Sequence, residues 1–202
     1  NKGIRNFIQV ENNDISKQSE EVGAKGTTVI SRNIFYNVPA RRKFLKSDKI
    51  EFKHIMNEFI RLSLSHPEIV FTLRNNNQLL YNLKKGNQKK RIVEVLGKSV
   101  EKKIIPIEEK TNLIKIRGYI FKPEYLNKSR NNQFLFINNR YVKSSYLNHA
   151  ISMSYDGLVD KEIKPSYILF LESDPSKIDV NVHPSKTEVK FDDENIIYAI
   201  IM

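Results

Sequence analysis

The residues best suited to chemistry lie near the end of the chain, in the stretch IDVNVHPSKTEVKF. Ile178, Val180 and Val182 would point to one face of a strand, because side chains alternate along extended backbone. Pro184 cannot donate a hydrogen bond to a neighbouring strand, so we expect the strand to end there and turn. Lys186 would then present a mobile ammonium group just past the strand, where it could contact a phosphate.

Two cationic stretches are the next candidates. One contains Arg41, Arg42 and Lys43, and the other, within the junction 84–91, contains three further candidates: Lys89, Lys90 and Arg91. Basic side chains that neutralise phosphates give DNA affinity that is independent of sequence and sensitive to salt. The formal net charge of +11 also favours polyanionic partners. The alternative is that both stretches are solvated faces, which is the usual fate of a run of charges.

The absences limit the catalytic possibilities. The 202 residues include no cysteine and only four scattered histidines, so we predict no metal site built from these side chains. None of the seven glycines forms a Gly-x-Gly, which excludes the common glycine-rich phosphate loops and dinucleotide fingerprints. No apolar run approaches the ~20 residues that span a bilayer. We therefore expect a soluble, cytoplasmic protein without a recognisable catalytic site of its own, and the missing initiator Met suggests a fragment.

The elements that position these residues follow from periodicity and turn chemistry. Apolar spacing predicts helices after Pro39, from Asp48 to Pro67 with Glu51 completing a capping box, and from Tyr146 to Tyr155. Further helices are expected at 92–96, ended by Gly97, and from Glu194. Alternation and turn residues predict strands at 4–10, 27–34, 69–74, 79–83, 104–108, 112–121, 134–137, 141–142, 166–172 and 178–182.

The order of these elements predicts an α+β chain with a mixed sheet that helices cover on one side. The cationic, glycine-containing junction after residue 84 is expected to be a domain boundary. We therefore predict one domain at residues 1–84 and a second at 88–202. Tyr155 and the aromatic residues near Phe134 lie at core spacing and are interpreted as packing residues.

Three ordered motifs cover nearly the whole chain. They are GTTV at 26–29 with FYNVPARRKFL at 35–45, FINNR at 136–140, and IDVNVHPSKTEVKF at 178–191. Their order and spacing resemble the MutL family of DNA mismatch-repair proteins. The departures are small, since Asn139 replaces the usual Gly of the second motif and asparagine tolerates left-handed backbone.

The resemblance implies a fold and a division of labour. Residues 1–84 would be the carboxy-terminal remainder of a GHKL ATPase α/β sandwich, and residues 88–202 a transducer domain with the fold of the second domain of a ribosomal small-subunit protein. The family binds ATP with Mg²⁺, but its catalytic Glu, its metal-binding Asn and its D-x-G-x-G segment have no counterpart here. We therefore expect this chain alone not to hydrolyse ATP.

The resemblance also implies residue roles. Gly26 would bring backbone near the adenine pocket, and Thr27 and Thr28 would bind the base region, the alternative being buried strand threonines. Lys186 would reach the neighbouring lobe and contact the terminal phosphate of ATP, the alternative being an ordinary surface lysine. Arg140 would anchor the transducer sheet or face DNA.

The implied function is that of a mismatch-repair coordinator, in which ATP binding gates dimerisation with a second copy, DNA binding and activation of partners. A mismatch-recognition protein of the MutS type would be one partner, and the expected location is a bacterial cytoplasm, associated with the nucleoid. Two rivals remain open. One is a type II topoisomerase ATPase fragment, although its lysine lies in a Q-T-K context, and the other is a nucleic-acid-binding module that uses no nucleotide.

Overall fold

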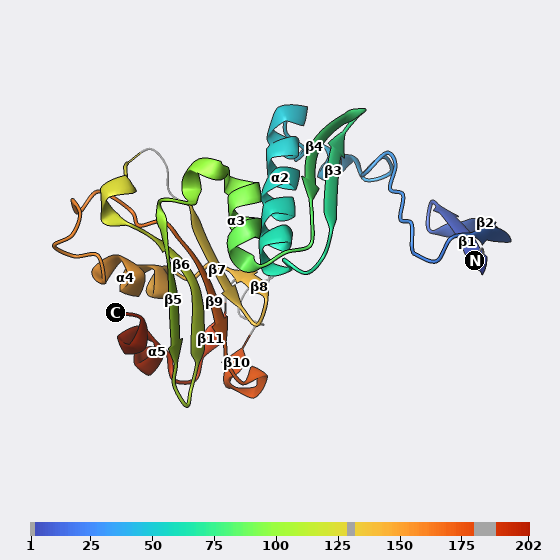
Figure 1. The fold of residues 1–202 in the computed structure, drawn as a ribbon. Coiled ribbons are helices and arrows are strands. Elements are labelled where there is room, and N and C mark those ends of the chain that lie inside the picture. Colours follow the sequence, from blue (N-terminus) through green and yellow to red (C-terminus); the bar gives the residue numbers. More distant parts are fainter. Residues whose placement is uncertain (1–2, 129–131, 180–188) are drawn as a thin grey trace. The chain divides into compact units, whose positions relative to one another are not determined.

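The computed structural model describes residues 3–128, 132–179 and 189–202 (Figure 1). The helices are α1 (Pro39–Arg42), α2 (Asp48–Ser65), α3 (Gln88–Leu96), α4 (Ser145–Met153) and α5 (Glu194–Ile201), with 3-10 turns η1 (Lys98–Val100), η2 (Pro123–Tyr125) and η3 (Pro175–Lys177). The strands are β1 (Gly3–Glu11), β2 (Asp14–Gly23), β3 (Phe71–Asn75), β4 (Gln78–Leu83), β5 (Ile104–Lys110), β6 (Lys115–Phe121), β7 (Gln133–Ile137), β8 (Arg140–Val142), β9 (Tyr167–Glu172), β10 (Ile178–Asp179) and β11 (Lys190–Phe191).

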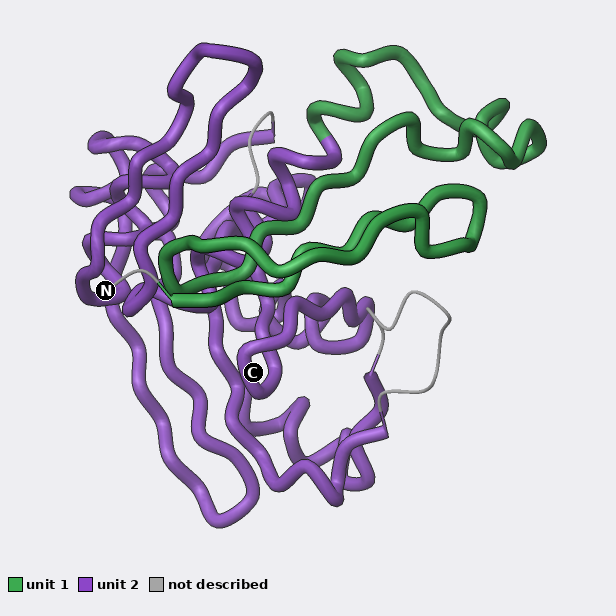
Figure 2. The backbone as a smooth tube through the Cα atoms, turned by 90° about the vertical axis from the view of Figure 1, so that its right-hand side faces the viewer, with its two compact units in different colours: residues 1–53 green, residues 54–202 purple. Residues whose placement is uncertain are grey.

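Contacts between Cα atoms divide the chain into two compact units, residues 1–53 and 54–202 (Figure 2). The second unit includes the later part of α2 and the β3–β4 hairpin, because Leu64 and Leu83 pack in one core cluster with Ile92 and Phe136. The predicted domain boundary between residues 84 and 88 stays a prediction. Among the described residues, no helix combines the length and apolar character needed to cross a membrane.

The first unit is built on the antiparallel hairpin β1–β2. Its tight turn uses Asn12 and Asn13, whose φ values of 51° and 72° are in the left-handed region that asparagine tolerates. The predicted strand at 4–10 is confirmed, but the predicted strand at 27–34 is wrong. The polar run 14–23 pairs with β1 instead, and no described strand pairs with residues 27–34.

The second unit is organised around a five-stranded mixed sheet with the order β5-β6-β9-β7-β8. Strands β7 and β9 run parallel and every other neighbouring pair is antiparallel. The turn between β7 and β8 is formed by Asn138 and Asn139, with φ values of 47° and 64°, which confirms that the second asparagine replaces glycine without loss of the turn.

Helices cover both faces of this sheet, which corrects the expectation of cover on one side. Leu169 and Leu171 pack with α4 and α5, whereas Ile168 and Phe170 pack with α3 and the end of α2. Strand β9 is therefore apolar at every position from Tyr167 to Leu171, as expected of a strand buried on both faces.

Side-chain caps explain why the helices begin where they do. Asn87 accepts a hydrogen bond from the backbone N–H of Lys90 and starts α3, and Ser144 accepts one from Leu147 and starts α4. At α2 the predicted capping box of Asp48 and Glu51 is wrong, because Glu51 accepts the backbone N–H of Lys46, at 2.8 Å, and Asp48 is the first residue of the helix itself. The expected helices and the remaining strands are thus confirmed, with ends that differ by a few residues; β10 is described only to Asp179.

Candidate functional site

The glycine and two threonines predicted to contact nucleotide follow β2 in irregular backbone. Gly26 has a φ of 148°, and an added Cβ there would meet no atom within 4 Å. Thr27 and Thr28 are exposed and lie outside any strand, so the alternative of buried strand threonines does not apply. The three residues are accessible to a ligand.

These residues share a concave surface with the hairpin. The hollow has a volume of about 1460 Å³, and its lining includes β1, residues 23–28 and part of the segment 30–37. This volume exceeds the roughly 300–1,000 Å³ of typical small-molecule pockets. The hollow therefore offers backbone and hydroxyl groups to a ligand but does not by itself enclose one.

The first cationic stretch follows two consecutive turns. Tyr36 donates its backbone N–H to Asn33 at 2.9 Å, and Val38 donates to Phe35 at 3.1 Å, which delivers the chain into α1. Arg41 and Arg42 are in this helix, whose four residues make a single turn, so the helix dipole neither favours nor opposes their charges. The third residue of the stretch, Lys43, is also exposed, so all three cations can reach a polyanion.

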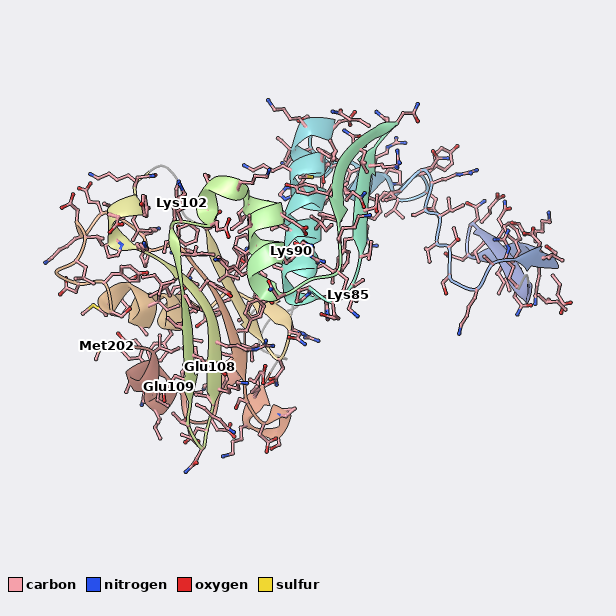
Figure 3. The ribbon with its side chains drawn as sticks, in the orientation of Figure 1. Lys85, Lys90, Lys102, Glu108, Glu109 and Met202 are labelled. Carbon is pink, nitrogen blue, oxygen red and sulfur yellow. The ribbon has the colours of Figure 1, made fainter. Side chains whose placement is uncertain are left out.

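The second cationic stretch is split by the fold. Lys89 lies 3.5 Å from Glu101, and Lys90 lies 3.9 Å from Glu94. Both lysine side chains are about half exposed, so these ion pairs contribute roughly 0–1 kcal/mol and can be exchanged for a phosphate. Figure 3 shows Lys90 on α3 and Lys85 in the preceding loop.

Arg91, the neighbour of Lys90, corrects the prediction of a DNA contact. Its side chain is fully buried, and its two terminal nitrogens donate hydrogen bonds to five backbone carbonyls. A phosphate cannot reach this guanidinium in the described structure. The sequence did carry a signal, because Arg91 lies next to Ile92 and one turn before Val95, on the apolar side of α3.

Arg140, the last of the seven residues predicted to contact DNA, is exposed at the start of β8. The turn before it is fixed by the Asn138 side chain, which donates to the Ser173 carbonyl at 2.9 Å and accepts the Ser173 N–H at 3.1 Å. The backbone that carries Arg140 is therefore rigidly placed, which suits either an anchoring or a DNA-facing role.

Lys186 and His183 lie outside the described residues. The flanks of their segment are described: Ile178 pairs with Phe191 and Asp179 with Lys190 in the antiparallel ladder of β10 and β11. Phe191 is buried in the same core cluster as α4 and α5. Within the described ranges, no three His, Cys, Asp or Glu side chains are grouped so that they could hold a metal ion.

The comparisons with known proteins cover the whole chain. Residues 92–202 match the family described as "DNA mismatch repair protein, C-terminal domain". The chain is 47% identical over 201 residues to the DNA mismatch repair protein MutL of Christiangramia forsetii. The aligned region covers 100% of this chain and 33% of that protein. The chain thus spans about a third of the length of this relative.

Two solved structures have a similar fold. One is the N-terminal domain of a DNA repair protein, with a TM-score of 0.76 at 20% identity, covering 98% of this chain and 66% of that one. The other is the Aquifex aeolicus MutL ATPase domain complexed with ADP, with a TM-score of 0.62 at 24% identity, covering 83% of this chain and 61% of that one. They confirm the predicted fold class. With the family match and the 47% identity, the three motifs read from the sequence lead to one conclusion: the chain belongs to the MutL family of DNA mismatch-repair proteins.

Proposed function

We propose that this chain is part of an ATP-gated coordinator of DNA mismatch repair. In the full-length protein, nucleotide binding would control dimerisation with a second copy, DNA binding and the activation of partners, including a mismatch-recognition protein of the MutS type. The observation that carries the proposal is the 47% identity to a MutL protein along the entire chain, which includes all three motifs. A cytoplasmic location near the nucleoid stays a prediction.

The chain would contribute two parts of the nucleotide site. Gly26, Thr27 and Thr28 would contact the base region, and their exposure beside the hollow of the first unit supports this role. Lys186 would contact the terminal phosphate, since a compact charge on a flexible stem can detect whether that phosphate is present. The Aquifex aeolicus MutL ATPase domain is complexed with ADP, which supports nucleotide binding in proteins of this fold.

The full-length protein would supply what this chain does not. Bound ATP with Mg²⁺ would provide the phosphoryl group that is hydrolysed. Among the described residues no acidic cluster suits a magnesium ion, so the metal and the catalytic base would be held elsewhere in the longer protein. We accordingly expect the 202-residue chain to show no ATP turnover above its own Lys186→Ala variant.

The exposed cations would hold DNA. Arg41, Arg42 and Lys43 are exposed, and Arg140 is carried by a turn that the Asn138 side chain fixes. Lys89 and Lys90 would exchange weak ion pairs for phosphates. A module that binds nucleic acid without nucleotide is the competing function, and the nucleotide experiment distinguishes the two.

The test is steady-state ATP hydrolysis and nucleotide affinity in the full-length protein. Lys186→Ala should lower kcat at least about 10-fold while nucleotide Kd changes less than about 3-fold, because the lysine acts on the phosphate that reacts. Lys177→Ala, which removes an exposed lysine from η3 in the same region of sequence, is the control and should retain the wild-type rate. Unchanged turnover in Lys186→Ala would contradict the proposed role.

A further inference from the structure

The C-terminal end of α2 lacks the usual means of ending a helix. The last four carbonyls of a helix have no partner within the helix. After Ser65 the chain continues with His66 and Pro67, with no glycine or asparagine cap, and the last turn of α2 contains no basic residue. Within α2, the Ser65 hydroxyl donates to the Leu62 carbonyl at 3.0 Å. Donors for the carbonyls that follow Leu62 come from another element.

Helix α3 supplies those donors from its first turn. Gln88 donates its side-chain N–H to the Leu64 carbonyl at 2.9 Å. One terminal nitrogen of Arg91 donates to the carbonyls of Ser63 at 2.7 Å and His66 at 3.0 Å. Two side chains of α3 therefore cap α2, and the positive charge of Arg91 lies at the negative end of the α2 dipole.

The other terminal nitrogen of Arg91 reaches both sides of the β3–β4 hairpin. It donates to the carbonyls of Pro67 at 3.2 Å and Ile69 at 2.6 Å before β3, and to the carbonyl of Lys84 at 3.0 Å after β4. The Gly86 N–H also donates to Pro67, at 3.0 Å. One guanidinium thus joins the end of α2 and both ends of the hairpin to α3; this set of five carbonyl contacts is termed the Arg91 clamp.

The physical chemistry of the Arg91 clamp requires arginine. Burying an isolated charge is unfavourable, and removing the partner of a buried charge is strongly destabilising. The nearest carboxylate oxygen, on Glu94, is 4.0 Å from Nε, so the carbonyls provide most of the compensation. Burial lowers the pKa of Arg91 below its ordinary value, while Glu94 and Glu68 oppose that change. A lysine has three donors on one nitrogen and cannot match a planar fork that reaches five carbonyls.

We propose that Arg91 is a positioning residue that attaches α2 and the β3–β4 hairpin to α3 and the five-stranded sheet, and that this attachment couples nucleotide occupancy to the transducer. The coupling rests on the proposed function. Its basis is connectivity: the chain from Gly26 to Lys43 continues directly into α2, and the other end of α2 is held by Arg91. Removal of the clamp leaves nucleotide contacts intact but loosens the elements that follow them.

The attachment is tested by hydrogen exchange of the 202-residue chain. Arg91→Lys should raise the exchange rates of the Ile69 and Gly86 amides at least about 10-fold relative to Val95→Ala, compared at equal global stability by adjusting urea. Val95 lies one turn after Arg91 along α3 and is buried in the core cluster that contains Leu64 and Ile92, so Val95→Ala controls for lost packing. Gln88→Ala removes one capping bond and should have an intermediate effect, which provides a measurement should Arg91→Lys not fold. The attachment is wrong if Arg91→Lys and Val95→Ala show equal exchange rates. If Arg91→Lys does not fold, wild-type exchange rates in Gln88→Ala would overturn the attachment.

The coupling is tested by kinetics in the full-length protein. Arg91→Lys should lower the kcat for ATP at least about 10-fold with nucleotide Kd changed less than about 3-fold, whereas Val95→Ala should keep both near wild type. Gln88→Ala should lower kcat by a smaller factor. If Arg91→Lys and Val95→Ala lose kcat equally, the residue is merely structural and the coupling is wrong. If the wild type lacks turnover, or Lys186→Ala is unaffected, the proposed function itself fails and the coupling fails with it, while the exchange experiment still decides the attachment.

Discussion

Gly26 and Gly118 have nearly the same backbone φ, 148° and 149°, but opposite surroundings. A Cβ on Gly26 would meet nothing within 4 Å, whereas a Cβ on Gly118 would lie 2.1 Å from the Ile168 carbonyl oxygen. The same contrast in burial holds between the two units as a whole. Among the residues that the structure describes, none from Gly3 to Lys53 is buried, and every buried one belongs to the range 54–202.

The comparison separates two kinds of residue. In the first unit large apolar side chains are exposed, including Val29 at 86% and Ile4 at 77%, next to the residues proposed to bind nucleotide. In the second unit, helices cover both faces of the sheet, and even an arginine is enclosed. Ligand contacts are therefore proposed for exposed residues of both units, and the coupling for the enclosed Arg91 of the second unit.

The largest expected effect on stability comes from replacing the two glycines with alanine. Gly118→Ala should destabilise the second unit by about 3 kcal/mol or more, because the new methyl would collide with backbone of β9. Gly26→Ala meets only the conformational cost of its φ, about 1–2 kcal/mol confined to the first unit. Urea unfolding followed by circular dichroism measures both, and similar shifts in the midpoint would show that the close approach at Gly118 does not govern stability.

The contrast in burial can also be tested with one buried and one exposed aliphatic side chain. Leu64 is 0% exposed and Ile30 is 67% exposed. Leu64→Ala should lower the unfolding free energy by about 2–5 kcal/mol, since it leaves a cavity in the core. Ile30→Ala should change it by no more than about 0.5 kcal/mol. Thermal unfolding is the measurement. A large loss of unfolding free energy in Ile30→Ala would contradict the exposure of Ile30 in the first unit.

The exposed cations of the two units can be compared by DNA affinity. Arg41→Glu with Arg42→Glu should weaken binding of duplex DNA about 10-fold or more and reduce its salt dependence. Lys161→Glu with Lys164→Glu changes the net charge equally at exposed positions of the second unit and serves as the control. Filter binding across a salt series is the measurement. Equal weakening by both pairs would assign the affinity to net charge rather than to the first stretch.

The smallest expected effect concerns a buried hydroxyl. Tyr155 donates to the Phe121 carbonyl at 2.7 Å, and burial raises the pKa of Tyr155 to about 12. An unfolded tyrosine ionises near pH 10, so between about pH 10 and 12 the unfolded state releases a proton that the folded state retains. Stability is therefore present below pH 10 and falls across this window.

Tyr155→Phe should remove part of that alkaline decline and cost about 1 kcal/mol at neutral pH. Tyr167, whose pKa burial also raises, keeps the decline from disappearing entirely. The exposed Tyr36 of the first unit provides the control variant Tyr36→Phe, which should leave the profile unchanged. Unfolding midpoints measured from pH 8 to 12 decide the matter, and identical profiles for wild type and Tyr155→Phe would refute the burial argument.

Much of the secondary structure was predictable because its signals are local. The apolar stripe of α2, the end of α3 at Gly97 and the asparagine turn after β7 each depend on residues within a few positions of one another. The three motifs likewise identified the family, because residue types and spacing are properties of the sequence alone.

Other outcomes were not predictable because they depend on which distant segments meet. Residues 27–34 include the β-branched residues typical of a strand, yet the polar run 14–23 became the partner of β1. The second helical cover of the sheet appears only when α2 and α3 pack against Ile168 and Phe170. A strand requires a neighbour and a buried face requires a cover, and neither is encoded in the segment itself.

Lys90 and Arg91 show most directly which properties the sequence determined and which the tertiary structure decided. The sequence determined that both are cationic, but the helix predicted from it began at residue 92, so both residues were assigned to the junction rather than to α3. Only the tertiary structure decided that Lys90 stays half exposed while Arg91 is enclosed by five carbonyls of α2 and the hairpin ends. The physical reason is that charge belongs to a residue, whereas burial belongs to everything packed around it.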